Sequence, residues 1–334
     1  MIGFLDAQLR AGAGFSLQAE YPSLFGEYPG GESLYLESQG RVLSHVGILV
    51  REYRHANLRM RVGLLGSVVT TPEYRGQGLA SRLVKEALEL LRRRGALICL
   101  LWSEANAFYE SFGFHRAGRE WDFKLSPLHL PPPTDTGIVD YDPVRHAYAV
   151  WHLYGRHDVK LDRSLEEHKR LCSIPKSRIF VAEREGTPTA YIVVNKGADF
   201  ENYVHEWGGE VDEVRRTLAW VQRQRFADRN LTVIAPAHYA LEPLKRISLS
   251  HWEGVLGLMK LLDRTRLMLL YGDYLRGRGI SFKWAKERNR FAIEGNEFPT
   301  ETDRDCLRLV FGEGGVTSFQ HPSLPFFLWG FDSI

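Results

Sequence analysis

Residues 75–80 read RGQGLA and separate two stretches of different pattern. The preceding residues 62–70 (VGLLGSVVT) form an apolar, β-branched run that is typical of a strand. After the glycines, apolar residues recur at helical spacing, at Leu79, Leu83, Val84, Ala87, Leu88 and Leu91. The pattern predicts a strand, a short glycine-rich turn and a helix, and such a turn leaves several backbone N–H groups free at the start of the helix.

The predicted turn is suited to binding a phosphate group. The free N–H groups and the helix macrodipole both attract an anion, and Gly76 and Gly78 allow a ligand to approach the backbone closely. The spacing fits neither of two common phosphate loops, because a dinucleotide-binding turn has a third glycine and a P-loop has widely spaced glycines followed by lysine. An ordinary βαβ unit with a compact turn is the alternative interpretation.

Two motifs resemble those of the Gcn5-related N-acetyltransferases (GNATs). The pattern R-x-x-G-x-A at residues 75–80 resembles the pyrophosphate loop of that family. Residues 105–114 (ANAFYESFGF) resemble its second signature, a short helix that carries a tyrosine and ends in Gly-Phe. The resemblance implies acetyl-CoA as the co-substrate. The cofactor-binding residues that it implies are Val68, Val69, Thr70, Arg75, Gly76, Gln77, Gly78, Leu79, Ala80 and Ser81.

The composition is that of an ordinary soluble protein, with 25% charged and 44% hydrophobic residues in 334. A net charge of +2 argues against the large basic field of a nucleic-acid-binding protein. We expect no membrane partner and no export, because the sequence has no run of 18 apolar residues and no signal-peptide pattern. Cys99, Cys172 and Cys306 are far apart, which predicts reduced thiols in a cytoplasmic protein. The predicted helices have no i, i+4 histidine pair, so we expect no metal.

The chain divides into three predicted domains. The first, residues 1–128, contains both motifs, and a proline-rich linker follows at residues 129–136. Residues 137–249 repeat the same order of predicted strands and helices, but their equivalent turn, residues 208–213 (GGEVDE), has no arginine and carries three carboxylates. Because these carboxylates would repel a pyrophosphate, we predict a second GNAT-like domain that has lost the cofactor.

Residues 250–334 predict a smaller α+β domain, with a pair of alternating strands near residues 280–293. This part resembles a shortened sterol-carrier-protein-like domain. Two GNAT-like domains followed by such a module resemble the enhanced intracellular survival (Eis-type) acetyltransferases. The expected fold class is therefore α/β with mixed sheets, as tandem GNAT folds followed by a small α+β domain.

Tyr109 is the candidate general acid. The resemblance places it at the proton donor of the family, just before Gly113 and Phe114, and a phenol with a pKa of about 10 suits the protonation of a leaving thiolate. The alternative is a packed aromatic residue beside Phe108 and Phe112. A splayed strand at residues 68–70 would offer backbone N–H groups to the oxyanion of acyl transfer.

Ile334 is the candidate general base, through its α-carboxylate. The resemblance implies a C-terminal carboxylate that returns to the first domain, and residues 324–334 (LPFFLWGFDSI) are aromatic and almost uncharged, unlike an ordinary polar terminus. A tail that docks only as structure is the alternative, and Glu73 and Glu104 are rival bases. Ser67 receives no role, because it stands one residue from the serine position of the family and one step along a strand reverses the face.

These observations predict an acetyl-CoA-dependent N-acetyltransferase. The acyl group would pass to a primary amine, in a small molecule or a peptide, by direct attack in a ternary complex. Two alternatives stay open: a scaffold that binds the cofactor without turnover, and a transferase that uses a longer acyl or an aminoacyl donor. The sequence leaves open the identity of the acceptor and whether the chain forms a homo-oligomer.

Overall fold

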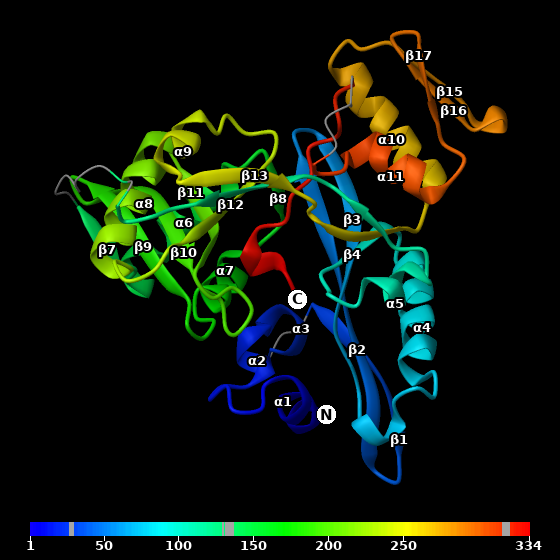
Figure 1. Ribbon diagram of the computed structural model, residues 1–334, viewed down its shortest axis with the longest axis horizontal. Coiled ribbons are helices and arrows are strands. Elements are labelled where there is room, and N and C mark those ends of the chain that lie inside the picture. Colours follow the sequence, from blue (N-terminus) through cyan, green and yellow to red (C-terminus); the bar gives the residue numbers. More distant parts are fainter. Residues whose placement is uncertain (27–29, 129, 131–136, 316–320) are drawn as a thin grey trace.

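The computed structural model describes the following residues of the chain: 1–26, 30–128, 130, 137–315 and 321–334. The predicted linker at residues 129–136 therefore lies outside the described residues, apart from Leu130. The described residues form two large sheets, which lie side by side, and a small antiparallel sheet (Figure 1).

The first sheet combines an antiparallel front with a parallel centre. In order across the sheet, its strands are β1 (Gly31–Ser38), β2 (Arg41–His55), β3 (Leu58–Thr70), β4 (Ala96–Leu101), β14 (Gly257–Leu261) and β5 (His115–Ala117), and β8 (Val159–Leu161) pairs with β2. Strands β1, β2 and β3 form an antiparallel meander, and β3 runs parallel to β4. The connection from β3 to β4 contains the glycine-rich turn, the short 3-10 helix η1 (Pro72–Tyr74) and helix α4 (Leu79–Arg93).

Helix α4 covers one face of this sheet because its apolar residues share one side. The residues buried against the strands are Leu83, Val84, Ala87, Leu88 and Leu91. The predicted apolar face is therefore confirmed, although Leu79 is only partly buried. Four short helices also belong to this part of the chain: α1 (Ile2–Leu9), α2 (Leu17–Glu20), α3 (Pro22–Phe25) and α5 (Asn106–Glu110). We call the first sheet with α1–α5 the first half of the molecule.

The second sheet repeats this plan. In order, its strands are β13 (Ser250–Gly254), β6 (Glu120–Lys124), β12 (Thr232–Pro236), β11 (Tyr203–Gly209), β10 (Thr187–Val194), β9 (Arg178–Arg184) and β7 (Ile138–Asp140). Strands β9, β10 and β11 form an antiparallel meander, and β11 runs parallel to β12 as β3 does to β4. With the helices α6 (Pro143–Gly155), α7 (Leu165–Leu171), α8 (Val211–Arg225) and α9 (Glu242–Ile247), this sheet makes the second half. The predicted α/β fold class is confirmed.

Four strands cross the predicted domain borders: β6, β8, β13 and β14. Strand β8 lies within residues 137–249, yet it pairs with β2 of the first sheet, and β13 lies within residues 250–334, yet it pairs with β6 in the second sheet. Strand β6 lies within residues 1–128, yet it pairs with β12 and β13 of the second sheet. Strand β14 lies within residues 250–334, yet it inserts between β4 and β5 of the first sheet. The sheets therefore do not follow the predicted borders. The physical reason is that every residue of β4 is buried, so this strand needs a partner on both edges, and that partner comes from a distant part of the chain.

A small unit follows the two halves in the sequence. Its elements are α10 (Arg264–Gly277), β15 (Phe282–Ala285), η2 (Lys286–Arg288), β16 (Arg290–Ile293), β17 (Asn296–Pro299) and α11 (Asp303–Phe311). Strands β15, β16 and β17 pair antiparallel, in agreement with the predicted alternation. Helix α11 contacts β5 and β14, so this unit rests on the first half. Its likeness to a sterol-carrier-protein-like domain stays a prediction.

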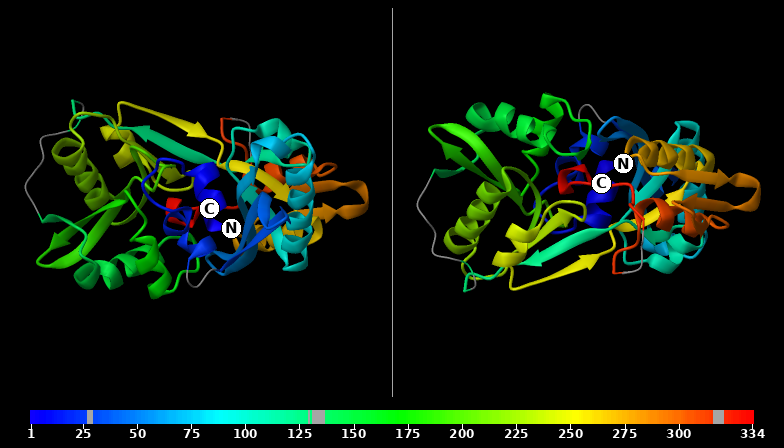
Figure 2. Two further views of the ribbon diagram at one scale, coloured as in Figure 1. Left: turned by 90° about the horizontal axis from the view of Figure 1, so that it is seen from below. Right: turned by 90° about the horizontal axis from the view of Figure 1, so that it is seen from above.

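The last segment of the chain, residues 324–334, returns between the two halves. Figure 2 shows it from two further directions, running from the small unit to the neighbourhood of α1–α3. Six of its large apolar side chains are buried, and Ile334 is partly buried. The six are Leu324, Phe326, Phe327, Leu328, Trp329 and Phe331. It ends in the short 3-10 helix η3 (Gly330–Asp332) and two further residues. We call residues 324–334 the tail.

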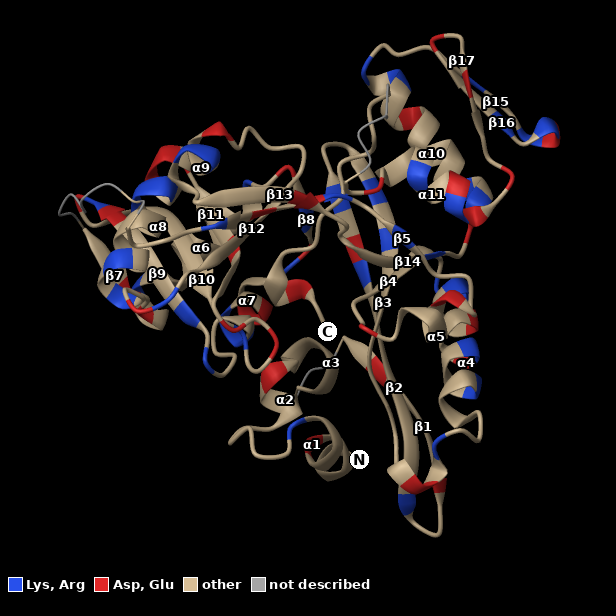
Figure 3. Ribbon diagram, in the orientation of Figure 1, with Lys and Arg blue, Asp and Glu red and all other residues tan. Residues whose placement is uncertain are grey.

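The surface charges are mixed. Figure 3 shows basic and acidic residues interspersed along α4, α8 and α11, as the small net charge of +2 leads one to expect. Within the described ranges, no helix combines the length and hydropathy needed to cross a bilayer. Among the same residues, no group of three or more His, Cys, Asp and Glu side chains is placed to hold a metal ion.

Candidate active site

A cavity of about 640 Å³ opens where β3 ends, between the start of α4 and helix α5. Nine of the ten predicted cofactor-binding residues line it: Val68, Val69, Thr70, Arg75, Gly76, Gly78, Leu79, Ala80 and Ser81. Gln77 does not line the cavity; it is exposed, and its side-chain nitrogen lies 3.5 Å from the carbonyl oxygen of Glu73. Tyr109 also lines the cavity, so the structure brings the two sequence motifs to one place.

The turn before α4 presents backbone rather than side chains to this cavity. Gly76 and Gly78 have positive φ angles of 76° and 77°, which other residues rarely adopt. Gly78 is the N-cap of α4, so the N–H groups that follow it have no acceptor within the helix. The first turn of α4, all of whose residues are described, contains no acidic side chain. A pyrophosphate fits this turn, because free N–H groups and the helix dipole both favour an anion there.

Strand β3 is distorted by a β-bulge beside the same cavity. Its register with β2 shifts between the pairs His45–Val69 and Gly47–Gly66, and Ser67 has a positive φ of 51°. The paired region of β3 and β4 ends at Leu64 and Leu100. Beyond that point, residues 68–70 of β3 line the cavity. A bulge of this kind interrupts the ladder and frees backbone N–H groups, as the predicted oxyanion donors require.

Tyr109 lies in α5 and only 6% of its surface is exposed. Its ring meets Phe108 and Phe114 edge-on, with centroid distances of 4.9 and 5.8 Å. Burial raises the pKa of Tyr109 to about 12, and a hydrogen bond with the Ser103 side chain opposes the shift. The hydroxyl therefore holds its proton at neutral pH. Both interpretations of this residue, the packed ring and the proton donor, fit its position.

A second cavity of about 230 Å³ adjoins the first. The two cavities share Val68, Ser103 and Tyr109 in their linings. The other lining residues come from the N-terminal helices, β3, the loop after β4, the second half and the tail: Leu9, Arg10, Leu17, Tyr21, Leu65, Gly66, Ser67, Trp102, Asp199 and Ile334. A molecule in one cavity can therefore meet a molecule in the other beside Tyr109.

Ile334 reaches the bulge of β3. A Cβ atom at Gly66 would lie 2.5 Å from the backbone oxygen of Ile334 and 2.7 Å from its backbone carbon, so glycine is required for this approach. The side chain of Ile334 packs against Val69 and the apolar residues of α1–α3. The rival bases lie elsewhere, because Glu73 and Glu104 are exposed and belong to the lining of neither cavity.

Asp199, in the loop between β10 and β11, brings a carboxylate from the second half to the second cavity. It accepts hydrogen bonds from the hydroxyl of Tyr21 and from Arg10, whose Nη2 lies 3.0 Å from Oδ1. Arg10 also pairs with the fully buried Glu20. Burial raises the pKa of Asp199, and Arg10 opposes this shift. Arg10 is thus shared by two carboxylates, of which Asp199 lines the cavity.

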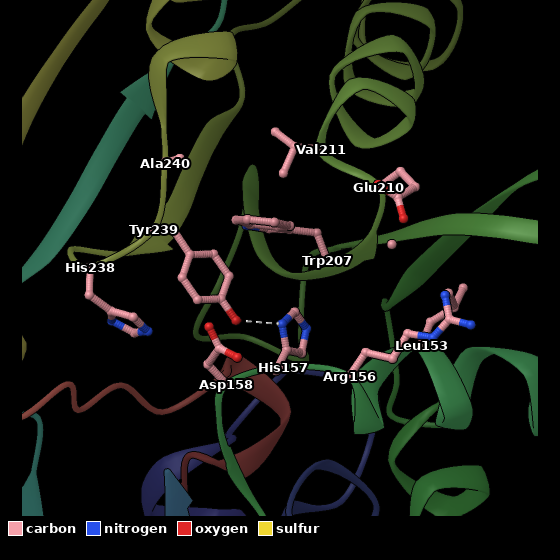
Figure 4. A pocket seen from close by; sticks show the side chains of 11 residues that line it. Leu153, Arg156, His157, Asp158, Trp207, Glu210, Val211, His238, Tyr239 and Ala240 are labelled. Atoms are coloured by element: carbon pink, nitrogen blue, oxygen red, sulfur yellow. Dashed lines mark hydrogen bonds between the residues drawn. The ribbon is translucent and has the colours of Figure 1, made fainter. Parts of the chain in front are cut away.

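The second half contains a cavity of about 350 Å³ in the equivalent position, at the end of β11 and the start of α8 (Figure 4). His157 and Tyr239 face each other in it, with Nδ1 and the hydroxyl 2.9 Å apart. Helix α8 has Glu210 as its N-cap and Asp212 and Glu213 in its first turn. These carboxylates stand at the helix end that attracts anions, which supports the prediction that this half binds no acetyl-CoA.

The sequence does not predict several residues that line the second cavity. Regular alternation along β3 excludes Ser67, but the bulge breaks the alternation and places it in the lining. Arg10 and Asp199 are 189 residues apart in the sequence. Neither residue belongs to a motif, so no local sequence pattern predicts their contact.

A family model described as an acetyltransferase (GNAT) domain matches residues 18–117. This chain carries a GNAT acetyltransferase domain. The matched residues extend from α2 to β5 and include the complete lining of the first cavity. The family resemblance of the two sequence motifs is thereby confirmed for the first half.

A curated protein is also similar to part of the chain. N-alpha-acetyltransferase 30 of Schizosaccharomyces pombe (strain 972 / ATCC 24843) is 31% identical to this chain over 84 residues. The alignment covers 24% of this chain and 55% of that protein, so the chain spans about half the length of the curated relative that it matches.

Solved structures resemble a larger part of the chain. A conserved protein of unknown function from Enterococcus faecalis V583, described as a probable N-acyltransferase, has a TM-score of 0.62 at 13% identity, with 78% of this chain and 69% of that one covered. A GCN5-related N-acetyltransferase from Kribbella flavida has a TM-score of 0.53 at 19% identity, with 70% and 61% covered. These likenesses concern the fold, and they extend well beyond the GNAT domain at residues 18–117.

Proposed function

We propose that the chain is an acetyl-CoA-dependent N-acetyltransferase that transfers an acyl group to a primary amine by direct attack in a ternary complex. The observation that carries this proposal is the meeting of two cavities at Tyr109. One cavity lies at the glycine-rich turn of the GNAT domain, where Gly76 and Gly78 would receive the pyrophosphate of acetyl-CoA. The other cavity, which ends at Ile334, would receive the amine.

Each of these groups has a part in the reaction. The thioester supplies an activated acyl carbon. The α-carboxylate of Ile334 takes the proton that the attacking amine must lose, and the backbone N–H groups of Val68 and Val69 donate to the developing oxyanion. As the carbon–nitrogen bond forms and the carbon–sulfur bond breaks, Tyr109 gives its proton to the departing sulfur. Tyr109 then regains a proton through solvent, and the products are an N-acylated amine and a free thiol.

The second cavity suits a compact amine that arrives with a positive charge. Leu65, Tyr21 and Trp102 give its wall apolar and aromatic surface, and Asp199 and Arg10 add a carboxylate and a guanidinium that are hydrogen-bonded to each other. An alkylamine has a pKa of about 10 and is protonated at neutral pH, so the carboxylate attracts it. A volume of about 230 Å³ is below that of a pocket for a drug-sized molecule. The amine group of a small molecule or of a lysine side chain is therefore the best match.

We expect Asp199→Asn to raise the KM for the amine acceptor and to leave the affinity for acetyl-CoA unchanged. Loss of a charge-assisted hydrogen bond of about 1.5–3 kcal/mol corresponds to a KM increase of roughly 10- to 100-fold. Steady-state kinetics at saturating acetyl-CoA measures this change. Asp228→Asn, at an exposed carboxylate of the second half, is the matched control. A wild-type KM in Asp199→Asn would exclude Asp199 from the acceptor site.

Calorimetry followed by a thiol-release assay tests the proposed function. We expect one acetyl-CoA per chain, because the turn of the second half is acidic, and thiol release when polyamines, aminoglycosides or lysine peptides are added. Binding without thiol release for every amine would favour the scaffold instead. Tighter binding and faster turnover of longer acyl-CoAs would favour the alternative donor, and an absence of any acyl-CoA binding would contradict the proposal.

A further inference from the structure

The tail packs against the second half at the place where its parallel strands separate. Strands β11 and β12 are paired only at Tyr203–Thr232 and Val204–Val233. Beyond these pairs, η3 of the tail contacts β11, and a Cβ atom at Gly330 would lie 2.2 Å from Nδ1 of His205. The tail thus occupies the part of the second half that corresponds to the open end of β3 in the first half.

Trp329 anchors the tail among aromatic residues of that region. Its ring stacks on His157 with a centroid distance of 4.1 Å and meets Trp207 edge-on at 5.3 Å. Both partners also line the cavity of the second half (Figure 4). The indole Nε1 donates to the carbonyl oxygen of Val159 at 3.1 Å, and Trp329 is fully buried.

A buried group of charges fixes the next turn of the tail. Arg163 donates to Asp332 at 2.8 Å and, through two nitrogens, to Glu206 at 2.9 and 2.8 Å. The hydroxyl of Tyr154 donates to the other oxygen of Asp332 at 3.0 Å. The side chains of Arg163 and Glu206 are fully buried and that of Asp332 is 2% exposed. Buried ion pairs of this completeness determine position, because breaking one leaves an unpaired buried charge.

Lys196, two residues after β10, holds the last residues of the tail. Its Nζ donates to the carbonyl oxygen of Gly330 at 2.8 Å and to the carbonyl and hydroxyl oxygens of Ser333, each at 2.7 Å. The Lys196 side chain is fully buried, and its Nζ lies 4.8 Å from the ring centroid of Tyr21, which lines the second cavity. Burial lowers the pKa of Lys196 to about 7, while Glu20 and Asp332 oppose the shift.

The next residue along the chain is Ile334, whose backbone carbon and oxygen lie against Gly66. Lys196 itself lines neither of the two cavities of the candidate active site. It therefore does not contact substrates there, but it binds Gly330 and Ser333, and Ser333 directly precedes the proposed base.

We propose that the second half serves as the socket of the tail, and that Lys196 is the positioning residue that sets the carboxylate of Ile334 beside the second cavity. We define the tail socket as Tyr154, Arg163, Lys196, Glu206 and Trp207. This inference rests on the proposed function, in which Ile334 accepts the proton of the amine. The inference gives the second half, which has no pyrophosphate turn, a function in catalysis. The second half completes the active site of the GNAT domain.

Lys196→Met tests the inference in the full chain, because methionine keeps a similar volume and removes the three hydrogen bonds. We expect kcat to fall by about tenfold or more, while the acceptor KM and the acetyl-CoA dissociation constant change by less than about twofold. Ser333→Ala removes one acceptor oxygen and should lower kcat in the same direction by less. Lys160→Met is the matched control, since Lys160 donates to Gly155 and His157 of the second half and not to the tail.

A double-mutant cycle shows whether Lys196 acts through Ile334. Two glycines appended after Ile334 move the carboxylate away from Gly66 and should lower kcat with acetyl-CoA still bound. In this extended chain, Lys196→Met should cause no further loss, because residues that act on one group are non-additive. Losses that simply multiply would show that Lys196 only stabilises the fold and would overturn the inference.

The remaining outcomes are equally decisive. A wild-type kcat in Lys196→Met overturns the inference. If Lys196→Met does not fold, a wild-type kcat in Ser333→Ala overturns the inference instead. Wild-type turnover in the extended chain excludes the carboxylate of Ile334 as the base. The same result excludes the positioning role of Lys196. Failure of the proposed function itself is distinguishable, because the unaltered chain would then release no thiol from acetyl-CoA with any amine.

Discussion

Replacing Gly78 with glutamate is expected to abolish acetyl-CoA binding without unfolding the chain. Gly78 caps α4 with a φ of 77°, a conformation that costs other residues roughly 1–2 kcal/mol. The added carboxylate would stand where the pyrophosphate is proposed to bind. Loss of two charge-assisted hydrogen bonds of about 1.5–3 kcal/mol each lowers the affinity by at least roughly 10²-fold. Calorimetry measures the dissociation constant.

The fold should survive this change, because a Cβ atom at Gly78 meets no heavy atom of the described residues within 4 Å. Gly186→Glu is the matched control. Gly186 has a φ of 75° and equally open surroundings, but it lies in the turn between β9 and β10 of the second half. The control should lose a similar amount of thermal stability and bind acetyl-CoA like the unaltered chain. Unchanged affinity in Gly78→Glu would remove the glycine-rich turn from the cofactor site.

Tyr109→Phe is expected to lower kcat by roughly 10²- to 10⁴-fold, the usual contribution of a positioned general acid. The substitution keeps the ring that packs against Phe108 and Phe114 and removes only the hydroxyl. The affinity for acetyl-CoA should therefore change little. Steady-state kinetics and calorimetry on the same preparation separate the two effects.

Tyr148→Phe, at an exposed tyrosine of α6, is the control for this substitution. The pH profile gives a second check. The pKa of Tyr109 is raised to about 12 by burial, so the residue stays almost fully protonated up to pH ~10. Titration of this residue should therefore cause no fall in kcat between neutral pH and pH ~10. Full activity in Tyr109→Phe would leave only the packing interpretation.

The part of the site that follows from the sequence is the part whose chemistry is local. Strand, glycine-rich turn and amphipathic helix succeed one another between residues 62 and 91, and glycine permits the positive φ angles of Gly76 and Gly78. Tyr109 follows this helix in the sequence after one strand, β4, and one loop. For this reason nine of ten predicted cofactor residues and the candidate acid line one cavity.

The part that does not follow depends on contacts between distant segments. Strand β14 has only five residues, and nothing in them indicates that they pair with β4 and β5. The bulge at Ser67 arises from the register of β3 with β2, not from the sequence of β3 alone. Asp199 joins the second cavity only because the two halves lie against each other.

The tail is predicted only in part from the sequence. Its aromatic composition indicates burial, but composition carries no information about the partner that covers it. The structure provides that partner in Lys196 and Arg163, whose bonds lead the chain to Gly66. Both residues read as ordinary surface cations in the sequence, since lysine and arginine are seldom fully buried.

A single-turnover experiment tests the central claim most directly. Protein in excess over acetyl-CoA is mixed with an amine that supports thiol release, the reaction is quenched, and mass spectrometry measures the product and the intact protein. We predict that acylated amine and free thiol form together in equal amounts, and that the mass of the protein stays unchanged with and without the amine. Transfer of the acyl group to the protein, or thiol release without acylated amine, would contradict direct transfer between the two cavities.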